Sequence, residues 1–133
     1  MKKLLFLIIA AGLFQFANAH EGHDKTPGTA AAPHGGLLQG TDSLFIEVLS
    51  TKEALKVYPL THDMKAIPLN TIKITGTMSI PRKAGKPEAL NFIASGDHLE
   101  AKVDAKGAHR YILNLDVTQG KIKEKLNFNV EPQ

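Results

Sequence analysis

The chain has 133 residues, no cysteine and a formal net charge of +3 at pH 7. This length fits one domain, and the lack of cysteine excludes disulfides, thiolate metal sites and cysteine nucleophiles. Because Lys2 and Lys3 fall in a predicted leader, we expect the processed chain to be almost neutral. The basic composition therefore gives no argument for nucleic acid or an anionic membrane as a partner.

Residues 1–19 have the three parts of a secretory signal peptide. A positively charged start is followed by an apolar run from Leu4 to Phe16 and then by Ala-Asn-Ala at 17–19. The run is shorter than the roughly 20 apolar residues that a membrane-spanning helix needs. We therefore expect cleavage after Ala19, no membrane span afterwards, and a periplasmic location.

Residues 20–33 contain no large apolar side chain and no hydrophobic period. Nothing in this stretch can offset the entropy lost when a backbone is ordered. The sequence predicts a flexible, histidine-containing tail, followed by a single domain at 34–133.

The domain shows short runs in which apolar and polar residues alternate, a pattern typical of antiparallel strands with one face on a core. In chain order, the runs centre on residues 44–49, 55–58, 72–80, 90–94, 99–103, 111–117 and 122–130. Glycine-containing turns separate most of them. Seven or eight short strands predict an all-β fold, namely a small antiparallel sandwich or barrel resembling an immunoglobulin domain.

Two histidines of the predicted tail lie next to carboxylates, as His20-Glu21 and His23-Asp24. Imidazole is a ligand for copper and zinc, and cleavage before His20 would add an α-amine that can chelate Cu(II) with the same residue's ring. The alternative is a solvated polar tail whose histidines are incidental, because a short histidine-rich tract is only compositional evidence.

Four histidines lie in the domain: His34, His62, His98 and His109. His34 lies in Pro-His-Gly-Gly at 33–36, where it is either part of a structural turn or a rigid ligand that completes a tail site. His62 is expected in a polar loop and His109 on the surface. His98 and Glu100 share one face of a strand, where they either ligate an ion or, more commonly, line an exposed surface.

The order of these motifs resembles the Pro-His-Gly-Gly domain near the N-terminus of periplasmic adaptor subunits of cobalt–zinc–cadmium type (heavy-metal RND) efflux pumps, here freestanding. The resemblance covers residues 32–130, including Asp-His-Leu-Glu-Ala at 97–101. It implies a compact antiparallel β domain that handles transition metals, with His34 and His98 as the positions of interest and Glu47 and Tyr58 serving the fold. The hairpin and lipoyl-like parts of an adaptor are absent, which favours buffering or delivery over direct efflux.

No Gly-x-Ser-x-Gly, His-Glu-x-x-His or phosphate-cradling motif is present, so we expect no enzyme activity. A copper oxygenase site would need a second fixed histidine and a substrate face, which the sequence does not indicate. The leading hypothesis is a periplasmic protein that binds Cu²⁺ or Zn²⁺, with an efflux adaptor or pump as a further candidate partner. The predicted ligands are His20, Glu21, His23, Asp24, His34 and His98. The alternative is an immunoglobulin-like interaction module with incidental histidines.

Overall fold

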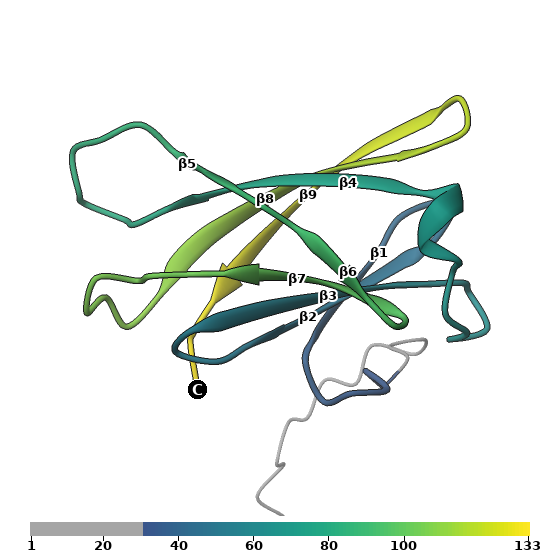
Figure 1. The fold of residues 1–133 in the computed structure, drawn as a ribbon, viewed down its shortest axis with the longest axis horizontal. Coiled ribbons are helices and arrows are strands. Elements are labelled where there is room, and N and C mark those ends of the chain that lie inside the picture. The colour runs from purple at the N-terminus through teal and green to yellow at the C-terminus, as the bar shows by residue number, and fades with distance from the viewer. Residues whose placement is uncertain (1–30) are drawn as a thin grey trace, which may run out of the picture.

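Two antiparallel β-sheets make up the part of the chain that the computed structural model describes, residues 31–133 (Figure 1). The five-stranded sheet has the order β1-β2-β3-β7-β6. Its strands are β1 (Leu37–Gly40), β2 (Phe45–Ser50), β3 (Ala54–Leu60), β6 (Ile93–Ser95) and β7 (His98–Lys102).

The four-stranded sheet has the order β5-β4-β8-β9. Its strands are β4 (Lys73–Ser79), β5 (Glu88–Leu90), β8 (Tyr111–Gln119) and β9 (Ile122–Val130). A 3₁₀ turn, η1 (Leu69–Thr71), lies between β3 and β4. Within residues 31–133, no helix has both the length and the apolar character needed to cross a membrane.

The core lies between the two sheets and is filled by the apolar face of each alternating strand. Ile46 and Val57 come from the five-stranded sheet, and Leu113 and Phe128 come from the other; each side chain is at most 1% exposed. Because successive residues of a strand point to opposite faces, the residues between them are left on the outer surfaces of the sheets. The outer surface of the five-stranded sheet carries the candidate site.

The predicted all-β, antiparallel fold is confirmed, with nine strands in the described region instead of seven or eight. The single strand predicted over residues 90–94 is wrong, since β5 and β6 belong to different sheets. Leu90 and Phe92 both pack against the core where the chain crosses between the sheets, so their spacing resembles that of one continuous strand. The leader at 1–19 and the tail at 20–30 lie outside the described residues.

A hydrogen bond between hydroxyl groups joins the two sheets inside the core. Tyr111 of β8 is fully buried, and its hydroxyl lies 2.8 Å from Oγ of Ser50 on β2. Burial raises the pKa of the Tyr111 phenol above 10.0, and the hydrogen bond with Ser50 partly opposes that rise. The folded protein therefore favours the neutral phenol more than the unfolded chain does.

This difference predicts an alkaline loss of stability that depends on Tyr111. Around and above pH 10 the unfolded chain binds fewer protons than the folded protein, so the free energy of unfolding falls as pH rises. At lower pH the phenol is neutral in both states, and this contribution to stability is fully present. Urea denaturation between pH 8 and pH 11 should show a smaller fall for Tyr111→Phe than for the parent. Equal falls in the two proteins would contradict this assignment.

Candidate metal centre

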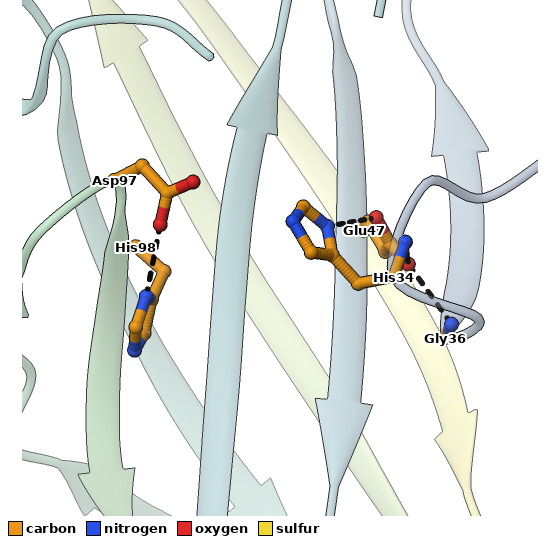
Figure 2. A network of polar contacts seen from close by, with 5 residues as sticks. All are labelled: His34, Gly36, Glu47, Asp97 and His98. Carbon is orange, nitrogen blue, oxygen red and sulfur yellow. Dashed lines mark hydrogen bonds and ion pairs between the residues drawn. The ribbon is translucent and has the colours of Figure 1, made fainter. Parts of the chain in front are cut away.

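The Pro-His-Gly-Gly turn is held against the five-stranded sheet by one buried carboxylate, that of Glu47 on β2. Oε1 of Glu47 accepts hydrogen bonds from the backbone N–H groups of His34, at 2.8 Å, and Gly36, at 2.9 Å. Oε2 lies 2.8 Å from Nδ1 of the His34 ring (Figure 2). The Glu47 side chain is fully buried, and these contacts replace the water that the carboxylate loses.

Both glycines of the turn are required by its geometry. Gly35 has φ of +78°, a left-handed conformation that glycine adopts without strain. At Gly36, a β-carbon would lie 2.4 Å from the Val48 carbonyl oxygen, closer than any van der Waals contact allows. The turn can therefore approach β2 closely enough for Glu47 to reach both backbone N–H groups.

The same carboxylate orients the His34 imidazole. A carboxylate only accepts hydrogen bonds, so Nδ1 carries the hydrogen, and in the neutral imidazole Nε2 then carries a free lone pair. In Figure 2, Nε2 lies on the side of the ring away from Glu47. The ring stacks on Tyr58 with its centroid 3.9 Å away, and the His34 side chain is 34% exposed. Nε2 is thus presented as a ligand by a fixed ring, the arrangement found in histidines that bind metals.

His98, at the start of β7, has a similar environment. Its Nδ1 lies 3.1 Å from Oδ1 of Asp97, and its ring tilts against Tyr58 with the centroids 4.8 Å apart. The hydrogen bond to His98 is the main reason that the pKa of Asp97 is lowered. His98 therefore also donates from Nδ1 to a carboxylate, and in the neutral imidazole its Nε2 carries the lone pair.

The structure brings His34 and His98 to the same tyrosine but not to one another. Tyr58 belongs to β3, the strand between β2 and β7, and its ring contacts both imidazoles. Figure 2 shows them on either side of that strand. Among residues 31–133, no three or more histidine and acidic side chains form a group that could hold a metal ion.

Negative charge nonetheless concentrates around Tyr58. Burial is the main cause of its raised pKa, and the carboxylates of Asp97, Glu47 and Glu100 raise it further. Their field disfavours the phenolate for the same reason that it favours a cation. These carboxylates approach Tyr58 from the neighbouring strands, whereas Lys56, which is paired with Glu100, adds a positive charge to the same sheet.

The remaining predicted residues lie elsewhere. His62 is exposed, and its Nε2 lies 3.2 Å from the Asp42 carbonyl oxygen, in agreement with a polar loop. His109 is exposed, as expected. His20, Glu21, His23 and Asp24 lie outside the described residues, and their role as ligands stays a prediction.

Sequence reasoning assigned Glu47 and Tyr58 only to the fold and did not place them beside the imidazoles. One signal for Glu47 was available, because it is the only charged residue in the run Phe-Ile-Glu-Val-Leu at 45–49. A charge in so apolar a strand needs a partner. The partner lies 13 residues earlier in the sequence, at a distance that no local periodicity indicates.

Comparisons with known proteins identify no relative. No protein-family model, no curated protein and no solved structure matches the chain significantly.

The close approach at Gly36 predicts a specific loss of stability. Gly36→Ala should lower the free energy of unfolding by about 1–3 kcal/mol, because the added methyl group forces the turn away from β2. Gly85→Ala is the matched control: a β-carbon there would have no neighbour within 4 Å, so its effect should be within about 1 kcal/mol of zero. Denaturant unfolding measures both changes, and equal effects would contradict the steric argument.

Proposed function

We propose that this chain is an exported, non-enzymatic protein that binds one divalent transition-metal ion, Cu²⁺ or Zn²⁺. In this proposal Nε2 of His34 provides a fixed ligand at the surface of the five-stranded sheet. His20, Glu21, His23 and Asp24 provide the others. Buffering of the ion in the periplasm, or its delivery to an efflux system, is the role that fits a domain with no catalytic motif.

The observation that carries the proposal is the hydrogen bond from His34 Nδ1 to the buried carboxylate of Glu47. Carboxylates in this position fix the tautomer and orientation of metal-binding histidines and increase their basicity. A histidine that served only as a turn residue would not need its outer nitrogen kept free and 34% of its side chain exposed.

The sequence separation also permits the proposed ligand set. Ten residues lie between His23 and His34, and an extended chain spans up to about 3.3–3.6 Å per residue. The intervening segment can therefore bring the upstream imidazoles to His34. Further ligands from outside the described region are needed, because residues 31–133 do not supply three.

The tautomer of His34 provides the sharpest test. In Glu47→Gln, the amide oxygen can still accept the backbone N–H groups while the amide nitrogen faces Nδ1. Nδ1 must then accept a hydrogen bond, which moves the ring proton to Nε2 and blocks the ligand position. We expect calorimetry with Cu²⁺ and Zn²⁺ to show about 10–100-fold weaker binding, the usual cost of losing such a partner.

Two comparisons make this test decisive. The triple variant His20→Ala, His23→Ala and His34→Ala should lose the site, whereas His109→Ala, which removes an exposed histidine, should bind like the parent. Parent affinity weaker than about 0.1 mM, equivalent to roughly 5.5 kcal/mol, would count against the proposal. Binding unchanged in the triple variant would do the same. Circular dichroism of each variant checks that the fold is kept.

The exposed edge of the five-stranded sheet supports a second candidate, a protein-interaction module. β6 is an edge strand, and its Ile93 is 66% exposed. Edge strands readily pair with another chain. Pull-down from periplasm with and without a chelator separates the two candidates, because a partner retained equally in both conditions favours the interaction module.

A further inference from the structure

One buried nitrogen is left unexplained by the proposed function. Nε2 of His98 is shielded from solvent and has no hydrogen-bond partner among the residues that the structure describes. Buried polar atoms of side chains usually have such a partner. In the neutral ring whose Nδ1 donates to the Asp97 carboxylate, Nε2 is an acceptor and can be satisfied by a donor or by a cation.

Glu100 lies at the distance that a cation between the two groups would require. Its Oε2 is 3.7 Å from His98 Nε2, too far for a hydrogen bond. Two ligands of a tetrahedral ion with bonds of about 2.1 Å are separated by about 3.4 Å. A shift of a few tenths of an ångström in the Glu100 side chain would complete this geometry.

We propose that His98 Nε2 and Glu100 Oε2 bind a divalent transition-metal ion, Zn²⁺ or Cu²⁺, at a second site that does not use the tail or His34. Imidazole nitrogen with carboxylate oxygen is a ligand pair that zinc accepts. The Asp97 carboxylate faces Nδ1 of His98, as the Glu47 carboxylate faces Nδ1 of His34. It therefore fixes the ring and leaves Nε2 free.

Local structure holds both ligands in place before an ion arrives. His98 and Glu100 are two residues apart on β7, so they point to the same face of the sheet. The hairpin with β6 is tight, with Ser95 paired to His98 and Ile93 paired to Glu100. The tilted contact with Tyr58, on the neighbouring strand β3, also supports the His98 ring.

The site is open on the side of Glu100. This side chain is 44% exposed and lines a groove of about 560 Å³, so an ion can enter as the carboxylate rotates. The groove is lined by Asn91, Ile93, Ala94, Ser95, Glu100 and Lys102. No third histidine or acidic ligand joins the pair within residues 31–133. Water would therefore fill the remaining positions, one more than at open zinc sites that have three protein ligands.

The test uses the processed chain carrying His34→Ala, which removes the first proposed site. Zinc chloride is added at pH 7.5 while the imidazole nitrogens are followed by long-range ¹H–¹⁵N NMR. We expect a saturable change at His98 Nε2, abolished by His98→Ala and at least about 10-fold weaker in Glu100→Gln. Glu53→Gln, which changes an exposed glutamate of the turn between β2 and β3, should bind like the His34→Ala parent.

Three results would overturn the second site. One is a His98 spectrum that zinc leaves unchanged at millimolar concentration. Another is a protonated Nε2 that zinc does not displace, which would make His98 an imidazolium paired with Asp97 and Glu100. The third is equal affinity in Glu100→Gln and Glu53→Gln. Because His34 is absent throughout, failure here leaves the proposed tail site intact, and failure of the tail site leaves this one intact.

Discussion

The burial of the Glu47 carboxylate is the constraint on which the rest of the site depends. A charged group removed from water is costly unless hydrogen bonds replace its hydration, and here three N–H groups within 2.9 Å do so. Two of them come from the backbone, so the chain must turn tightly at 33–36 and approach β2 closely. Gly35 and Gly36 make that approach possible. The orientation of the His34 ring is a direct consequence of the same arrangement.

Strand register explains why Glu47, Tyr58 and His98 lie next to one another across the five-stranded sheet. Glu47 and Tyr58 are directly paired between β2 and β3, and β7 lies on the other side of β3. Neighbouring strands are about 4.8 Å apart, which is close enough for aromatic rings on successive strands to contact one another. Tyr58 thus touches an imidazole on each side. It therefore supports both imidazole rings.

Sequence periodicity was a good guide to regular strands and a poor guide to long-range contacts. Burial alternates in β8 over residues 111–117 and in β9 over residues 126–130, and the faces of these stretches could be predicted directly. Ile122, at the start of β9, continues the apolar pattern in the sequence but is 48% exposed. β1 has only four residues, two of which are partly buried, so it offers no comparable signal. The shared face of His98 and Glu100 followed from a spacing of two residues. The pairing of His34 with Glu47, and the place of Tyr58 between the imidazoles, depend on register between separate strands, which single-sequence patterns do not contain.

The two imidazoles differ in a way that bears on how the surface would handle an ion. Each has a carboxylate at Nδ1, and both lie in the field of the acidic groups around Tyr58. The His34 side chain is 34% exposed, whereas that of His98 is 15% exposed and its Nε2 is shielded from water. A ligand that is open to water exchanges its ion without moving other atoms, whereas a shielded ligand needs a neighbouring side chain to rotate first. In both proposed sites the attraction for a cation would come from the carboxylates placed near each imidazole and not from net charge, and the burial of each histidine would set the barrier to exchange.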